Sequence, residues 1–326
     1  MVASLFMASP RSLAKISYSV VTLTMLDTRY HIIYLCAIFL MLGFGIIIGD
    51  SFIGPIQVRQ NTANLAVLRT KVDGALQDAN TAKDQAGKLE SSIESLRPRL
   101  VQNQMQNKRV IIVQTGDSPD ATASARTSLI DAGATTATCV VADKLNALDQ
   151  REAQDIATEL NTAAPNLTVA SDDPNSTIIH AITETLLQGS KNHPANASVI
   201  QVLQHHDLVT VTGDLGANNA NFVIVGGETD DSAAGDKSDS VIIEGLKHLA
   251  TRPISIVGCE PLNVTTSSIP TYQSENVASV DCIDQPLGML DLPFAINGGV
   301  DIDDYGLKST AHRQIPVSLA SAEGSL

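Results

Sequence analysis

The sequence predicts an α/β protein: a transmembrane helix near the N-terminal end, a coiled-coil stalk, and a Rossmann-like or flavodoxin-like domain with a mainly parallel sheet. Three observations predict this arrangement. No Asp, Glu, Lys or Arg occurs from Tyr30 to Gly49, and apolar residues follow at heptad spacing from Leu65 to Leu100. After residue 108, short apolar runs alternate with segments that carry helix start and stop signals, as in α/β folds.

The uncharged stretch defines the expected transmembrane helix, residues 30–53. Its length matches the roughly 20 residues that cross a hydrocarbon core about 30 Å thick. A cleaved signal peptide is the alternative, but the apolar region is long for one and no A-x-A site follows Gly49. We therefore expect a single-pass signal anchor whose partner is the lipid bilayer.

The flanking charges predict the orientation of this helix. Arg11, Lys15 and Arg29 precede the span, and Arg59 is the first cation after it. Because cytoplasmic flanks carry an excess of Lys and Arg, residues 1–29 are expected in the cytoplasm and the remainder of the chain outside it.

A coiled-coil stalk is expected over residues 55–107. Its surroundings are polar, and Pro98 is expected to end or kink the helix. Gly74 and Gly87 each weaken the helix by up to about 1 kcal/mol. We expect a homo-oligomer through this seam; a lone helix lying on the globular domain is the alternative. The a and d positions are Leu65, Leu68, Val72, Ala75, Ala79, Ala82, Ala86, Leu89, Ile93, Leu96 and Leu100.

Residues 108–307 are expected to form an extracytoplasmic α/β domain, followed by a C-terminal tail at 308–326. "KRVIIVQTG" predicts a buried strand, and the next helix has Ser118 as its cap and Gly133 as its stop. "TTATCVVAD" is the next strand, so the pair predicts a parallel sheet with right-handed crossovers. Further strands are expected in "DLVTVTG", "NFVIVGG", "RPISIVG" and "NVASVDCID", and further helices at 149–163, 174–189, 238–250 and 285–298.

Composition and motifs exclude several classes of function. The net charge of −14 argues against a nucleic-acid partner. No GxGxxG, GxxxxGK[ST] or GxSxG motif occurs, so neither a nucleotide site nor a hydrolase is supported, and an enzyme is not expected. Asp117, Asp281 and Asp284 follow predicted strands, where α/β sites lie, but caps and turns also use such residues. The pair His205 and His206 is expected in a solvated loop or at a strand entry, with a weak metal site as the alternative.

The cysteines are the candidate metal ligands. Cys259 and Cys282 lie at or near the ends of two predicted strands, and Cys139 lies within another. If those strands are neighbours, the thiols can hold a soft ion such as Cu(I), for which thiolates are suited, or form a disulfide. Buried unpaired cysteines are the remaining alternative. Met289 and His312 are possible additional ligands.

The chain resembles the MctB-type copper transporter family. The resemblance rests on "RYHIIYLCAIFLMLGFGIIIGDSF", the heptad stalk, "KRVIIVQTGD" and the distal "VDCIDQPLGMLDLPFAINGGVDIDDYG", and it covers residues 29–320. It implies copper homeostasis, with copper as the possible bound ion and a pore-forming role in an outer membrane; it assigns no ligands. The distal signature comprises Val280, Asp281, Ile283, Asp284, Gly288, Ile296, Asn297, Gly298, Gly299, Tyr305 and Gly306.

Two functions follow from these observations. The first is a membrane-anchored copper transport or homeostasis protein whose α/β domain lies outside the cytoplasm. The alternative is a structural or scaffolding protein of the cell envelope that presents a docking domain on its stalk. An envelope enzyme on the α/β scaffold ranks third.

Overall fold

The computed structural model of the chain describes residues 28–165, 173–191, 193–229, 235–298 and 303–315. The expected cytoplasmic segment, except its last two residues, and the end of the expected tail lie outside this part. Contacts divide the chain into two units, Met1–Thr81 and Ala82–Leu326, which are described separately.

The long helix α1 (Thr28–Val101) contains the predicted apolar helix of the first unit. Among the described residues, Arg29–Gly49 is the one stretch that is long and apolar enough to cross a membrane, and none of it is buried in protein. Tyr34 and Met41 are 74% and 78% exposed. Water solvates such a surface poorly, whereas lipid accommodates it. The apolar helix predicted from the sequence is therefore confirmed.

The end of α1 belongs to the second unit and passes through Pro98. The sequence predicts an end or a kink there, but the helix continues to Val101. Arg97 explains this continuation, because its Nη1 lies 2.6 Å from Asp131 Oδ2 and its side chain is buried. Val101 and Met105 are also buried in the core of the second unit. These tertiary contacts outweigh the local cost of proline.

The second unit is built on a seven-stranded sheet in the order β3-β2-β1-β4-β5-β6-β7. All neighbouring strands are parallel except β2 and β3, which run antiparallel. The predicted mainly parallel sheet is confirmed. The strands are β1 (Arg109–Gln114), β2 (Thr135–Val141), β3 (Val209–Thr212), β4 (Asn221–Val225), β5 (Ser255–Cys259), β6 (Ala278–Val280) and β7 (Asp304–Tyr305).

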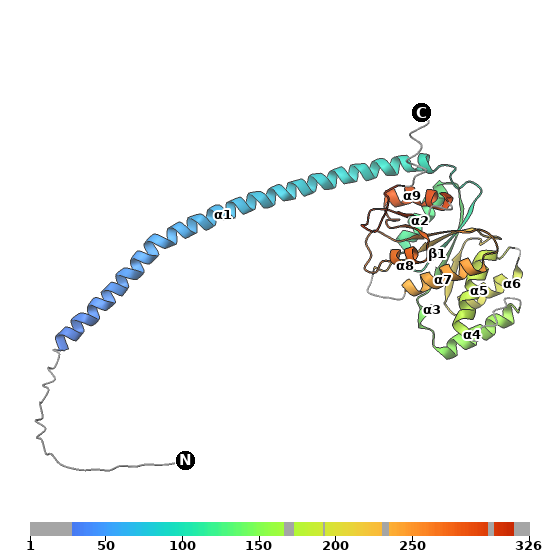
Figure 1. The fold of residues 1–326 in the computed structure, drawn as a ribbon, viewed down its shortest axis with the longest axis horizontal. Coiled ribbons are helices and arrows are strands. Elements are labelled where there is room, and N and C mark those ends of the chain that lie inside the picture. The colour runs from blue at the N-terminus through green and yellow to red at the C-terminus, as the bar shows by residue number, and fades with distance from the viewer. Residues whose placement is uncertain (1–27, 166–172, 192, 230–234, 299–302, 316–326) are drawn as a thin grey trace, which may run out of the picture. The chain divides into compact units, whose positions relative to one another are not determined.

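Helices cover both faces of the sheet (Figure 1). The end of α1 packs on one face together with α2 (Pro119–Asp131) and α9 (Pro286–Gly298). The other face carries α3 (Lys144–Ala147), α4 (Gln150–Ala163), α5 (Pro174–Gln188), α6 (Pro194–His205), α7 (Gly235–Leu249) and α8 (Ile269–Ser274). Of these helices, the sequence does not predict α3, α6 or α8.

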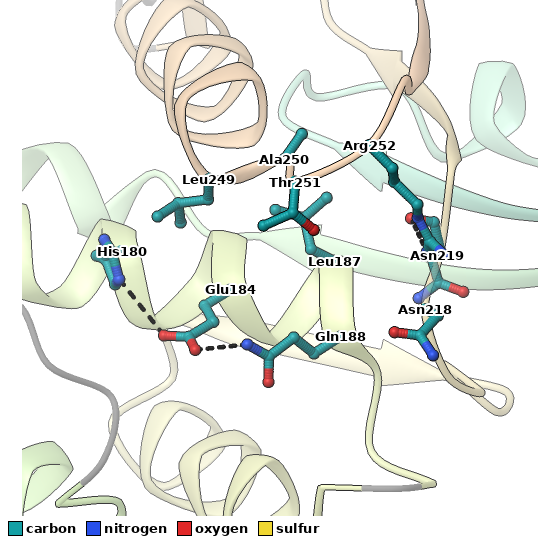
Figure 2. Close-up of a pocket in the computed structure, with 10 residues that line it drawn as sticks. All are labelled: His180, Glu184, Leu187, Gln188, Asn218, Asn219, Leu249, Ala250, Thr251 and Arg252. Carbon is teal, nitrogen blue, oxygen red and sulfur yellow. Dashed lines mark hydrogen bonds and ion pairs between the residues drawn. The ribbon is translucent and has the colours of Figure 1, made fainter.

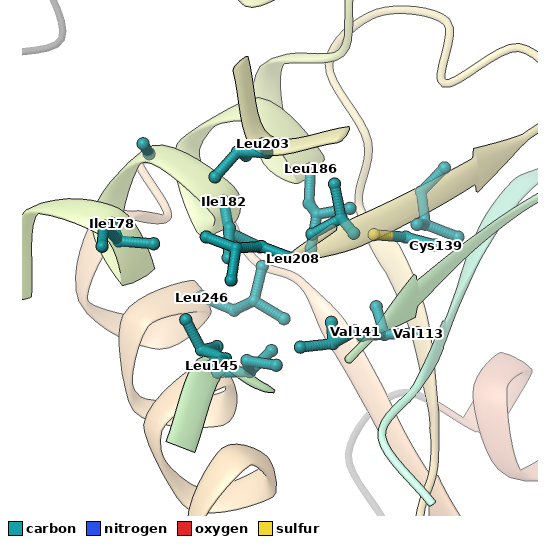
Figure 3. Close-up of a cluster of buried hydrophobic side chains, with 14 of the residues drawn as sticks. Val113, Cys139, Val141, Leu145, Ile178, Ile182, Leu186, Leu203, Leu208 and Leu246 are labelled. Atoms are coloured by element: carbon teal, nitrogen blue, oxygen red, sulfur yellow. The ribbon is translucent and has the colours of Figure 1, made fainter. Parts of the chain in front are cut away.

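Two hydrophobic cores result, one on each face. Alternation along β1 divides its residues, so that Ile111 and Val113 enter the core with α4 to α7, while Val110 and Ile112 enter the core with α2 and α9. Figure 3 shows part of the first of these cores, which also contains Cys139.

The turn from β1 to α2 forms as the sequence predicts. Ser118 Oγ accepts the N–H of Ala121 at 3.3 Å, and Pro119 occupies the first helical position. Gly133 follows with φ +91°, a conformation that residues with a side chain rarely adopt. The cap and the glycine stop are therefore confirmed.

The strand order reverses between β1 and β4, which is where open α/β sheets usually bind ligands. Here the loops at that point meet directly. A Cβ atom on Gly116 would lie 2.4 Å from the carbonyl oxygen of Gly227. Asp117 closes the same junction, because its carboxylate accepts the hydroxyl of Thr229 at 2.6 Å. The carboxyl ends of β5 and β6 carry a denser set of reactive side chains.

Candidate thiol and carboxylate site

Polar and thiol side chains gather at the carboxyl ends of two neighbouring parallel strands. Cys259 ends β5 and pairs in register with Val280, the last residue of β6. Glu260 follows β5, and Asp281 and Cys282 follow β6. All four side chains belong to residues that are at most 1% exposed. Because parallel strands end at one edge of the sheet, two thiols and two carboxyl groups share this edge.

Burial and nearby acidic groups raise the pKa values of both thiols. Burial raises the pKa of Cys259 well above its ordinary value, and Cys282 and Glu260 raise it further. Burial also raises the pKa of Cys282, followed by the negative charges of Asp281 and Asp291. Both groups are therefore thiols at neutral pH until a cation offsets these charges. No disulfide joins them.

Cys139 lies apart from this pair. It belongs to β2, and β1 and β4 separate that strand from β5. Its sulfur is in the core on the other face, in the same cluster as Leu186 and Leu208 (Figure 3). Burial there raises the pKa of Cys139 to about 12. The structure thus brings together Cys259 and Cys282 but leaves the third predicted ligand in apolar surroundings.

The carboxylates of Glu260 and Asp281 are fixed by the segment that follows β7. Glu260 Oε1 accepts the Nζ of Lys308, and its Oε2 accepts the N–H of Ser268 at 2.7 Å. Asp281 accepts the N–H groups of Leu307 and Lys308 at 2.8 and 2.9 Å. Both carboxyl groups are therefore held in place by more than one hydrogen bond.

Asp291 on α9 is different. Its side chain is fully buried, and neither oxygen has a hydrogen-bond partner among the described residues. Burial and the charge of Asp281 raise the pKa of Asp291 to about 8. A buried acid without a partner is costly unless it holds a proton or meets a cation. The sequence offers one signal for it: a lone acid inside the apolar run "GMLDLPFAI".

The other sequence candidates lie elsewhere or serve the fold. Asp284 accepts the N–H of Leu262 at 2.6 Å. His312 lies 3.3 Å from Asp304 with its side chain 71% exposed. The prediction that His205 and His206 lie in a loop or at a strand entry is correct for His206, which lies in the turn between α6 and β3 with its ring 2.9 Å from Glu159, and wrong for His205, which ends α6.

The donor set at the β5 and β6 ends suits a soft cation. Thiolates select Cu(I), and a positive ion would offset the buried acids beside them. No three His, Cys, Asp or Glu side chains within the described residues stand in an arrangement that holds a metal ion. Two thiols are nevertheless a sufficient donor set for Cu(I), which accepts two-coordinate sites.

Comparison with known proteins identifies the family. A family model described as "Copper transport outer membrane protein, MctB" matches residues 25–316. The chain belongs to the MctB family. Curated relatives named "Copper transporter MctB" occur in two strains of Mycobacterium tuberculosis and in Mycobacterium bovis. Each is 20% identical over 332 residues, which span 91% of this chain and 100% of the relative. The family resemblance stated from the sequence is confirmed, and with it the link to copper transport and to a membrane.

Proposed function

We propose that this MctB-family chain is a membrane-anchored copper transport or homeostasis protein that binds Cu(I) through Cys259 and Cys282. One observation carries the proposal: two buried thiols lie at the carboxyl ends of neighbouring strands, beside a buried carboxyl group that has no hydrogen-bond partner among the residues the structure describes. Asp281 lies beside the Cys282 thiol, and Asp291 can release its proton when a cation binds, so both acids favour a cation there. Copper enters this account as the cargo, in keeping with the names of the relatives.

The anchoring and orientation follow from α1. In our proposal Arg29–Gly49 crosses the bilayer once, residues 1–29 face the cytoplasm, and the α/β domain lies outside it. The family description places the family in an outer membrane. A thiol pair outside the cytoplasm meets oxidising conditions, and complete burial would protect these thiols from reaction.

The thiol pair is tested by Cu(I) titration of the full chain in detergent micelles against a chromogenic Cu(I) chelator. We expect one tightly bound ion per chain. Replacing both cysteines, Cys259→Ser with Cys282→Ser, should weaken binding by at least about 100-fold, because each thiolate is a principal ligand.

The matched control is Cys139→Ala, which removes another buried thiol of the same unit and should leave the affinity unchanged. Equal binding by the wild type and the Cys259/Cys282 variant would exclude the thiol site. If neither form competes with the chelator, the family's link to copper does not pass through these cysteines.

The heptad face of α1 supports a homo-oligomer and favours the second candidate function, a scaffold that presents a docking domain. Leu65 and Leu68 occupy a and d positions and are more than half exposed in the single chain. Such leucines are stabilised when a second copy of the helix covers them. A scaffold without copper would show the same oligomer and no binding in the titration above.

Replacing the two seam residues, Leu65→Gln with Leu68→Gln, should weaken self-association by at least about tenfold, because apolar area no longer becomes buried. Val67→Gln with Leu76→Gln is the matched control, since these residues are also more than half exposed but lie off the a and d positions. Analytical ultracentrifugation in detergent measures the dissociation. A monomeric wild type, or equal weakening by both pairs, would exclude the predicted seam.

A further inference from the structure

A second candidate site lies on the opposite face of the sheet, between α5 and the end of α7. It is a cavity of about 330 Å³ with ten lining residues. Figure 2 shows His180, Glu184 and Gln188 along one side and Arg252 with Asn218 and Asn219 at the other. Cavities of this size are at the lower end of those that hold small molecules, so a ligand here would be small.

The cavity has one negative end. Glu184 projects from α5, and its side chain is 19% exposed. Gln188 Nε2 donates to Glu184 Oε1 at 2.6 Å, and His180 Nε2 lies 3.4 Å from Oε2 (Figure 2). Burial lowers the pKa of His180 against the opposing effect of Glu184, and the nearby His248 lowers it further, so the imidazole is mostly neutral at neutral pH. The carboxylate is thus held in place and open to a cationic group.

The other end is positive. Arg252 uses Nη2 to donate to the backbone carbonyl of Asn219 at 2.9 Å. No other hydrogen bond or ion pair of Arg252 occurs within the part of the chain that the structure describes, so its remaining guanidinium donors are available to a carboxylate. Among the ten lining residues, Glu184 carries the carboxyl group and Arg252 the guanidinium group.

The wall between these groups has both apolar and polar side chains. Leu187, Leu249 and Thr251 line it, so it offers apolar contact and one hydroxyl group. Asn219, beside Arg252, is held in place, because its Nδ2 donates to the carbonyls of Leu186 and Leu215 at 2.7 and 2.9 Å. A preformed cavity with opposite charges at its two ends selects a dipolar ligand, because a ligand with one charge leaves the other protein charge without a partner.

We propose that this cavity binds a free amino acid, or an equally small zwitterion, with the ligand carboxylate on Arg252 and its ammonium group on Glu184. The proposal is independent of the thiol site, since the two sites lie in different cores on opposite faces of the sheet.

The test is equilibrium dialysis of the full chain in detergent micelles against a mixture of the twenty common L-amino acids, with the retained species measured by mass spectrometry. We expect one or a few amino acids to be retained by the wild type. Arg252→Gln and Glu184→Gln should each reduce retention at least about tenfold, since each removes one charged partner. Arg126→Gln, an exposed arginine on α2, is the matched control and should leave retention unchanged.

Blocked forms of the retained amino acid separate the two contacts. The N-acetyl derivative lacks the ammonium group and the amide derivative lacks the carboxylate, so both should bind at least about tenfold more weakly than the parent. The unfolding temperature of each variant is measured as well. A variant that unfolds at the same temperature as the wild type is folded, so its weaker retention of amino acids has another cause than loss of folding. No retained amino acid, retention unaffected by both cavity variants, or equal binding of the blocked forms would overturn the proposal.

Discussion

Replacing Lys308 with methionine should lower the free energy of unfolding of the second unit by about 3–5 kcal/mol, because it leaves a buried carboxylate without its cationic partner. Glu260 has a fully buried side chain, and Lys308 Nζ bonds both its Oε1 and the carbonyl of Pro261, the latter at 3.1 Å. Urea unfolding of the full chain in detergent, monitored by amide hydrogen exchange in β1 and β4, measures this change.

Two comparisons separate charge from packing. Adding Glu260→Gln to Lys308→Met should recover much of the lost free energy, since the buried charge is then gone. Lys144→Met removes an exposed ion pair of 2.9 Å with Glu152 and should cost less than about 1 kcal/mol. If Lys308→Met costs no more than Lys144→Met, Glu260 is not the buried, lysine-dependent group described above.

Asp291→Asn should stabilise the second unit at pH 8 and change little at pH 4. The folded-state pKa of Asp291 is raised to about 8, whereas an unfolded aspartate titrates near about 3.9. Between these values the folded chain keeps a proton that the unfolded chain releases. The free energy of unfolding therefore falls as the pH rises from about 4 to about 8.

The size of this effect is large for one side chain. A pKa shift of about four units corresponds to a change of at most about 5 kcal/mol in the free energy of unfolding. Relaxation of the site around the charge should reduce this change to about 3 kcal/mol. Urea unfolding at pH 4 and pH 8, monitored by tyrosine fluorescence, gives the difference between wild type and variant. Asp120→Asn, at an exposed first-turn position of α2, is the control and should show no such gain at pH 8. Parallel pH profiles of wild type and Asp291→Asn would contradict the raised pKa.

Local signals in the sequence account for much of the architecture. The structure contains the elements that depend on residues close in sequence. These are the apolar helix before Asp50, the helix with its Ser118 cap and Gly133 stop, and the strands. The continuation of α1 past Pro98 depends on Asp131, a partner 34 residues away, so no local rule predicts it.

The candidate site is less accessible to such reasoning. The sequence places Cys139, Cys259 and Cys282 at or near strands, but it does not give the strand order or the face on which each thiol lies. The order β2-β1-β4-β5 keeps Cys139 on β2 away from β5, and the pairing of β5 with β6 brings Cys259 and Cys282 to the same edge of the sheet. Lys308 falls in the expected tail, yet it pairs with Glu260, 48 residues earlier. Asp291 is marked in the sequence only by its apolar neighbours.

The central claim is that Cys259 and Cys282 together hold copper, and X-ray absorption at the copper edge of the Cu(I)-loaded full chain tests it most directly. The account predicts a first shell dominated by two sulfur atoms, which is lost in the Cys259→Ser/Cys282→Ser variant and retained in Cys139→Ala. A first shell of nitrogen and oxygen alone, or a sulfur signal that persists in the Cys259/Cys282 variant, would contradict it.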